Sequence, residues 1–294
     1  MQTFIGSRAL PRLVYHRPAE MTEVLRLMEE DTSWTLVAGG TDLIPALRKG
    51  VWSYPDGVRV IDVRDLSELR GIDLEQETVR IGAATRLADI IRSPVIAEHA
   101  PVLAEAVQDM ASLQVRNSAT IGGNLCTASP AADTAPPLLA LDAEVEIVDL
   151  QGTLQRMPLT EFFQGPGRCA CQGNQLLTSI RFPVLRAGEQ TCRRKMGLRR
   201  AFTISVISMA MKAKMDNNVC LDIRLAFGSV APTPIRTRVT EDLVRGQSLT
   251  FKLIEQAADQ ASQEVSPISD VRASAEYRRD MAKVLTRRAL QSLT

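Results

Sequence analysis

Histidine is almost absent from this chain of 294 residues, which contains only His16 and His99. Because the two are far apart in sequence, a serine–histidine–aspartate triad or a histidine-rich metal centre is not expected. The five cysteines are scattered and odd in number, and Cys169 and Cys171 lack zinc or iron–sulfur spacing. We therefore expect free thiols, no metal ligands and no catalytic acid or base, so that a bound cofactor carries any chemistry.

Long apolar runs are also missing, since none approaches the roughly 20 residues that cross a bilayer. The formal net charge of +1 gives no overall basis for binding nucleic acid or an anionic membrane. The first residues have neither the basic nor the apolar region of a signal peptide. We therefore expect a cytoplasmic protein without a membrane span or a nucleic-acid partner.

Two Gly–Gly pairs are the most informative feature that is present. They lie in residues 36–43, Leu-Val-Ala-Gly-Gly-Thr-Asp-Leu, and in residues 119–124, Ala-Thr-Ile-Gly-Gly-Asn. We interpret each as a loop at the end of a strand, where glycine permits a tight turn and a close ligand. Successive N–H groups in such a loop form a nest for phosphate oxygens. Two nests predict a pocket that closes on a diphosphate from two sides.

The pattern of predicted elements indicates an α+β chain. The first loop connects a predicted strand at 34–38 with a predicted helix at 41–49, but no G-x-G-x-x-G is present, so we do not expect a Rossmann domain. Residues 219–227 alternate between apolar and polar, as in a half-buried strand. Predicted helices at 250–264 and 274–293 follow, which favours an antiparallel sheet covered by helices.

Taken together, these motifs resemble the FAD-binding middle subunit of the molybdenum hydroxylases, the family of xanthine dehydrogenase and carbon monoxide dehydrogenase. The resemblance runs nearly end to end. Its most specific segment is residues 116–124, Arg-Asn-Ser-Ala-Thr-Ile-Gly-Gly-Asn, and residues 38–43, 129–133, 225–234 and 274–279 support it in the right order. A string of ordered motifs is more specific than any single one.

The resemblance implies an α+β fold with a flavin domain of the vanillyl-alcohol-oxidase type, also called PCMH-like. Two α/β subdomains would hold the cofactor, with expected bounds of 1–57 and 58–172. A C-terminal α+β domain, expected at 173–294, would add an antiparallel sheet with helices.

The resemblance also implies the residues that contact the cofactor. The two loops would line the pyrophosphate, Asp133 would bind a ribose hydroxyl, and Leu177 and Lys195 would lie near the adenine or flavin ring. A lysine at the N1/C2 edge of a flavin stabilises the reduced anion. Without the resemblance, Asp133 reads equally well as a turn residue or helix cap, and Lys195 as a solvated surface charge. The expected cofactor-binding residues are Val37, Ala38, Gly39, Gly40, Thr41, Asp42, Leu43, Ala119, Thr120, Gly122, Gly123, Asn124, Asp133, Leu177 and Lys195.

The function that the resemblance implies is electron transfer. FAD would be non-covalent, because the first loop has no histidine or cysteine to attach it. Electrons would come from iron–sulfur clusters on a partner and leave to NAD⁺ or another acceptor. Molybdopterin and 2Fe–2S clusters would reside on a large and a small partner subunit in a higher hetero-oligomer.

The sequence leaves several alternatives open for the function and for the contacts of the Arg-rich segment. The chain could be a non-catalytic assembly subunit that holds FAD or a phosphate ligand. A stand-alone flavin oxidase is less favoured, because no acid or base for a substrate pocket is evident. The family commonly has an aspartate after the Arg-rich stretch, where this chain has Thr203-Ile204-Ser205, and this leaves the contacts of that segment open. Arg199 and Arg200 could meet the phosphates of an acceptor or the acidic surface of a partner.

Overall fold

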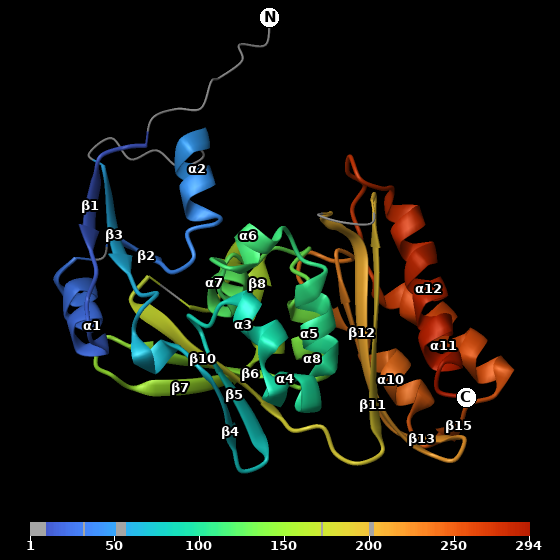
Figure 1. The fold of residues 1–294 in the computed structure, drawn as a ribbon. Coiled ribbons are helices and arrows are strands. Elements are labelled where there is room, and N and C mark those ends of the chain that lie inside the picture. Colours follow the sequence, from blue (N-terminus) through green and yellow to red (C-terminus); the bar gives the residue numbers. More distant parts are fainter. Residues whose placement is uncertain (1–9, 32, 51–56, 172, 200–202) are drawn as a thin grey trace, which may run out of the picture.

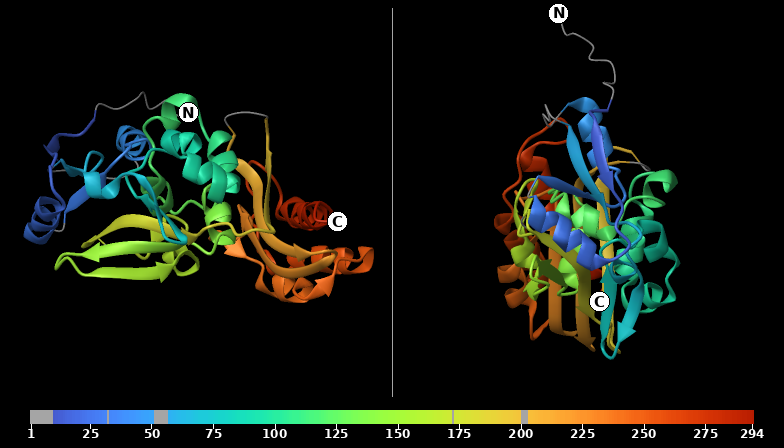
Figure 2. Two further views of the ribbon diagram at one scale, coloured as in Figure 1. Left: turned by 60° about the horizontal axis from the view of Figure 1, so that its bottom comes forward. Right: turned by 90° about the vertical axis from the view of Figure 1, so that its left-hand side faces the viewer.

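The computed structural model describes residues 10–31, 33–50, 57–171, 173–199 and 203–294. Its elements form three successive parts, each built on one main sheet (Figure 1). Figure 2 shows that the small N-terminal sheet and the C-terminal sheet lie at opposite ends, with helices and a five-stranded sheet between them. The α+β class expected from the sequence is confirmed.

The N-terminal part is a three-stranded parallel sheet in the order β1–β3–β2, with two helices. Helix α1 buries Val24, Leu27 and Met28, whose spacing places them on one helical face. Gly50 ends α2 in the left-handed conformation, with φ of 65°, as a C-terminal glycine commonly does. The elements are β1 (Leu13–His16), α1 (Met21–Glu30), β2 (Trp34–Val37), α2 (Leu43–Lys49) and β3 (Val58–Asp62).

The middle part packs a layer of short helices against an antiparallel sheet in the order β4–β5–β10–β6–β7. The largest apolar core lies between them. The 3-10 helix η1 (Ser67–Leu69) leads into this part. Its strands are β4 (Ile72–Glu75), β5 (Thr78–Gly82), β6 (Glu144–Asp149), β7 (Leu154–Pro158), β8 (Phe163–Gly165), β9 (Arg168–Cys169) and β10 (Gln175–Pro183). Its helices are α3 (Leu87–Arg92), α4 (Pro94–His99), α5 (Pro101–Gln108), α6 (Leu113–Arg116), α7 (Ile121–Cys126), α8 (Ala135–Ala140) and α9 (Leu159–Phe162).

The C-terminal part is an antiparallel sheet in the order β11–β12–β13–β14, with β15 also paired to β13. One face packs on α5 and α8 of the middle part, and α10 and α12 cover the sheet from the other side (Figure 1). The alternation at 219–227 is therefore confirmed as a strand. The elements are β11 (Glu189–Gly197), β12 (Ser205–Asp216), β13 (Val219–Gly228), β14 (Ile235–Arg236), α10 (Arg238–Val244), β15 (Gln247–Ser248), α11 (Phe251–Glu264) and α12 (Ala275–Gln291).

The pairing of strand β10 indicates where the boundary between the middle and C-terminal parts lies. The expected boundary at 172/173 places this strand with the C-terminal domain, and that boundary stays a prediction. However, β10 pairs with β5 on one side and β6 on the other, so it is the central strand of the middle sheet. We therefore propose that the division falls between β10 and β11.

Partly buried ion pairs connect the middle and C-terminal parts. Asp142, which follows α8, accepts hydrogen bonds from Arg224 and Arg236 on β13 and β14. The Arg236 guanidinium also binds Glu241, whose side chain is fully buried. These bonds fix the C-terminal sheet against the helical layer. Across the described residues, no helix is long and apolar enough to span a membrane.

Candidate functional site

The first glycine loop makes a close contact with the second. A Cβ atom on Gly39 would lie 2.3 Å from the Ser118 carbonyl oxygen and 2.7 Å from the Ala119 Cα. Real Cβ atoms do not approach so closely, so only glycine lets the two loops touch here. Gly40 has φ of 68°, a left-handed conformation that glycine adopts without cost. The chain therefore turns at Gly40 directly after the strand β2.

The N–H groups of this first loop point to an anion site. Among the residues that the structure describes, the N–H groups of Gly39, Gly40 and Thr41 have no hydrogen-bond acceptor. Three successive bare donors are what the predicted nest in the loop at residues 36–43 requires, and binding of an anion there stays a prediction.

The second loop differs from the expectation. Gly122 and Gly123 do not end a strand but form the first turn of α7, which Thr120 caps. The N–H of Ile121 donates to Thr85 (3.0 Å), that of Gly122 to Ala83 (2.9 Å), and that of Gly123 to the Thr120 hydroxyl (3.1 Å). The second loop is therefore not a nest, because the fold uses these donors itself.

Side chains of the second loop provide the remaining donors. The Thr120 oxygen accepts from Gly123, so its own O–H is left to donate outward. The Asn124 carbonyl oxygen accepts from the Thr134 hydroxyl at 2.5 Å, which leaves its NH₂ group for another acceptor. A hydroxyl and an amide can thus complement the N–H groups of the first loop.

A groove with a volume of about 580 Å³ runs between the two loops. Thr127, just after α7, donates to the Asp42 carboxylate at 2.9 Å across it. Since a carboxylate repels phosphate, we interpret Asp42 as a brace between the loops rather than as a ligand of a diphosphate. The groove is lined by the expected residues Val37, Ala38, Gly39, Gly40, Thr41, Asp42, Leu43, Ala119, Thr120, Gly123 and Asn124.

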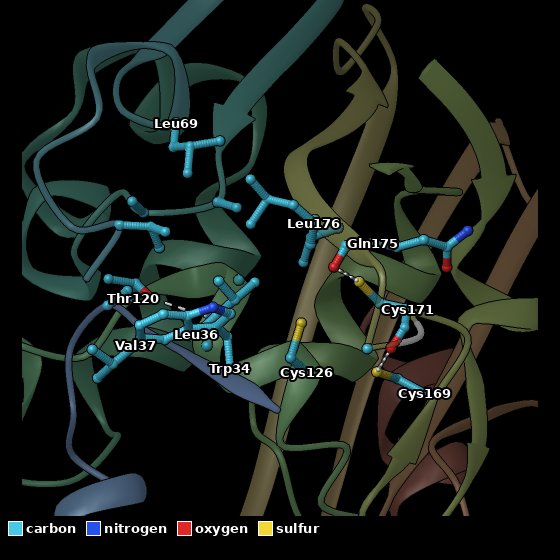
Figure 3. A pocket seen from close by; sticks show the side chains of 18 of the residues that line it. Trp34, Leu36, Val37, Leu69, Thr120, Cys126, Cys169, Cys171, Gln175 and Leu176 are labelled. Atoms are coloured by element: carbon cyan, nitrogen blue, oxygen red, sulfur yellow. Dashed lines mark hydrogen bonds between the residues drawn. The ribbon is translucent and has the colours of Figure 1, made fainter. Parts of the chain in front are cut away.

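An apolar hollow of about 510 Å³ continues the groove, because Val37, Thr120 and Cys126 line both. The expected residues Gly122 and Leu177 lie in its wall. Other residues of this lining are not expected from the sequence, since isolated residues outside the two loops carry no motif. The additional residues that Figure 3 labels are Trp34, Leu36, Leu69, Cys126, Cys169, Cys171, Gln175 and Leu176.

Asp133 and Lys195 lie apart from both the groove and the hollow, and they bind each other. The Lys195 Nζ is 2.7 Å from the Asp133 carboxylate, and the two side chains are only 7% and 8% exposed. The other carboxylate oxygen accepts from the Ser205 hydroxyl at 2.5 Å. Lys195 is therefore not a solvated surface charge, and Asp133 still has lone pairs for a further donor. Their contacts with a cofactor stay a proposal.

The Arg-rich stretch that contains Lys195 is the edge strand β11. Arg193, like Lys195, turns inward and donates to the Asp109 carboxylate at 2.7 Å. Arg200 lies outside the described residues. No group of three or more histidine, cysteine, aspartate or glutamate side chains could hold a metal ion anywhere in the described part of the chain.

The geometry fits a dinucleotide. The groove offers N–H and O–H donors suited to a diphosphate, and the adjoining hollow is walled by Trp34, Leu36 and Leu177, which suit a flat ring. Both volumes lie within the range of about 300–1,000 Å³ that is usual for cofactor sites. FAD, with two ring systems joined by a diphosphate, meets these requirements.

Comparison with known proteins gives two family matches that together cover most of the chain. Residues 8–185 match the FAD binding domain in molybdopterin dehydrogenase. Residues 194–293 match the CO dehydrogenase flavoprotein C-terminal domain.

Individual relatives agree with these matches. The chain is 34% identical over 283 residues to the glyceraldehyde dehydrogenase medium chain of Sulfolobus acidocaldarius, covering 96% of this chain and 99% of that one. It is 33% identical to a xanthine dehydrogenase FAD-binding subunit of Escherichia coli, over 94% of each chain. Among solved structures, a chain of carbon monoxide dehydrogenase from Hydrogenophaga pseudoflava superposes with a TM-score of 0.91 at 31% identity, covering 96% of this chain and 97% of that one.

Proposed function

Because this chain belongs to the family of FAD-binding domains of molybdopterin dehydrogenases, we propose that it transfers electrons as the flavin subunit of a molybdenum hydroxylase. The family matches confirm the resemblance, the α+β fold class and the FAD cofactor that the motifs imply. They also identify the chain as a component of an oxidoreductase. The acceptor, the electron path and the roles of individual residues are the proposal.

The main support for this proposal is that the unpaired N–H groups of the first loop lie beside an apolar hollow. The bare N–H groups of Gly39, Gly40 and Thr41 face a groove whose other wall bears the Thr120 hydroxyl and the Asn124 amide. We assign the diphosphate of FAD to this groove and one ring system to the hollow.

When bound, FAD accepts electrons singly and releases them in pairs. The residues of this chain bind and orient it, and they need not act as acids or bases. Lys195 is held by Asp133 inside the protein, so a positive charge is fixed in place without a solvated, mobile side chain. At the edge of a flavin ring such a charge favours the reduced form.

We place the other cofactors on partner chains. Relatives named medium chain or FAD-binding subunit are by name parts of larger enzymes. We propose a large subunit with molybdopterin and a small subunit with 2Fe–2S clusters, which pass electrons through this chain to NAD⁺. A cytoplasmic location, where free thiols persist, belongs to the same proposal.

An anaerobic visible spectrum tests the function. The FAD-loaded chain is expected to lose its flavin absorption band when NADH is added, because hydride transfer is reversible and needs only a nicotinamide site on this subunit. Dithionite gives the fully reduced reference spectrum. A flavin that dithionite reduces but NADH leaves oxidised would contradict NAD⁺ as the acceptor. A flavin that also stays oxidised in the complete complex with substrate would favour the non-catalytic assembly subunit.

A further inference from the structure

Three cysteines that are distant in sequence gather at one wall of the apolar hollow. Cys126 is the last residue of α7, whereas Cys169 ends β9 and Cys171 follows two residues later. The Cys169 thiol donates to the Cys171 carbonyl oxygen (3.7 Å) and the Cys171 thiol donates to the Gln175 carbonyl oxygen (3.5 Å), while Cys126 lines the same hollow beside them. Figure 3 shows the three side chains together, with Trp34 and Leu36 on another side of the hollow.

The remaining cysteines lie elsewhere. Cys192 is on β11 and Cys220 is on β13, where both pack in the core of the C-terminal part. None of the five cysteines forms a disulfide. Cys192 and Cys220 therefore serve as internal controls for the reactivity of the three thiols at the hollow.

The environment of Cys169 favours its thiolate form. The neighbouring Cys126 thiol lowers the pKa of Cys169 to about 7, against the opposing effect of burial. The same contacts, together with burial, raise the pKa of Cys126. Burial raises the pKa of Cys220 to about 11 and also raises that of Cys192. At neutral pH a substantial fraction of Cys169 is therefore thiolate, beside a Cys126 thiol that stays protonated.

We propose that Cys169 and Cys126 are a thiol pair that peroxides oxidise to a disulfide, and that nucleotide in the hollow shields this pair. The arrangement is that of an attacking thiol and a resolving thiol, with helix α7 packed on β9 so that the two backbones are close. The shielding rests on the proposed function, because it requires that the hollow hold part of FAD. The oxidation does not.

The reaction needs only a peroxide as oxidant. The Cys169 thiolate attacks one peroxide oxygen, so that an S–O bond forms, the O–O bond breaks and the second oxygen leaves as water after taking up a proton. The Cys126 sulfur then attacks the sulfur of this sulfenic acid. An S–S bond forms, the S–O bond breaks, and the hydroxide takes the Cys126 proton. Two thiols and one hydrogen peroxide give one disulfide and two waters.

The disulfide would act on the site through α7. This helix carries the capping Thr120 at its start and is followed by Thr127, which braces Asp42 of the first loop. Joining its end to β9 fixes both positions and draws two lining side chains together across the wall of the hollow. We therefore expect the oxidised chain to bind FAD at least tenfold more weakly than the reduced chain.

Mass spectrometry of the flavin-free chain tests the pair. After a brief treatment with hydrogen peroxide at pH 7.5 and blocking of the remaining thiols, non-reducing peptide maps are expected to show a Cys126–Cys169 linkage. Cys192 and Cys220 are expected to stay as blocked thiols. The initial rate should fall as the pH drops below about 7, because the Cys169 thiolate is lost. Prior loading with FAD should slow the reaction at least tenfold.

Two variants make the result specific. Cys169→Ser is expected to abolish the disulfide, whereas Cys192→Ser should leave its rate unchanged. A linkage through Cys171, equal oxidation of Cys192, or no disulfide in the flavin-free chain would overturn the pairing. If FAD binds, as its spectrum shows, yet does not slow the reaction, the shielding is wrong. If FAD does not bind at all, the proposed function fails, while the disulfide in the flavin-free chain still tests the pair.

Discussion

Replacing Gly39 with alanine is expected to weaken FAD binding about 5- to 150-fold. The added Cβ would lie 2.3 Å from the Ser118 carbonyl oxygen, so the two loops must move apart. Such overpacking costs about 1–3 kcal/mol, and 1.4 kcal/mol corresponds to a factor of ten in affinity. The nest of the first loop would then no longer face Thr120 and Asn124 across the groove. Titration of the flavin-free variant with FAD, followed by flavin fluorescence, measures the effect.

Gly152→Asn provides the control for the Gly39 variant. Gly152 lies in the turn between β6 and β7, where no atom would come within 4 Å of an added Cβ. Its φ of 79° is one that asparagine tolerates. This variant should bind FAD as the original chain does. If Gly39→Ala lowers the thermal stability but leaves the FAD affinity unchanged, the contact between the loops has no part in binding.

Replacing Lys195 with methionine is expected to lower the free energy of unfolding by about 3–5 kcal/mol. Removal of one partner of a buried ion pair leaves the other charge without compensation, and this carries a cost of that size. Asp133 is 8% exposed in its side chain and, among the described residues, would retain only the Ser205 hydroxyl as a partner. Urea unfolding of the flavin-free chain measures the change without any contribution from the cofactor.

A double-mutant cycle separates the ion pair from other effects of the methionine. Asp133→Asn combined with Lys195→Met should cost less than the sum of the single changes, because the double variant buries no unpaired charge. Lys214→Met is the control, since Lys214 is exposed on the neighbouring strand β12 and a surface change there should stay within about 0.5 kcal/mol. Additive costs would show that Asp133 and Lys195 do not stabilise each other.

The sequence predicts those parts of the site that depend on local backbone chemistry. Gly39 and Gly40 indicate a turn after a strand, and the structure places them there, although the strand is only partly buried. The alternation at 219–227 indicates a sheet strand for a similar reason, because side chains alternate between its faces. Such features depend on a few adjacent residues, so the pattern alone is enough.

Features that depend on distant partners could not be predicted in this way. Strand β11 has a polar sequence, and its charges become buried only because Asp109 and Asp133 from the middle part meet them. The N–H groups of the second loop donate to the carbonyl oxygens of Ala83 and Thr85. No pattern within that loop predicts these partners. The three thiols at the hollow likewise come together through the packing of α7 on β9.

The central claim is that the groove binds the diphosphate of FAD while the hollow holds a ring at its end. Calorimetric titration of the flavin-free chain with FAD, and separately with FMN, tests this claim most directly. FMN has the flavin but lacks the diphosphate bridge and the adenine. The account predicts one FAD per chain and at least about 100-fold weaker binding of FMN, a difference of about 2.7 kcal/mol. Equal affinities for the two, or no binding of FAD, would contradict it.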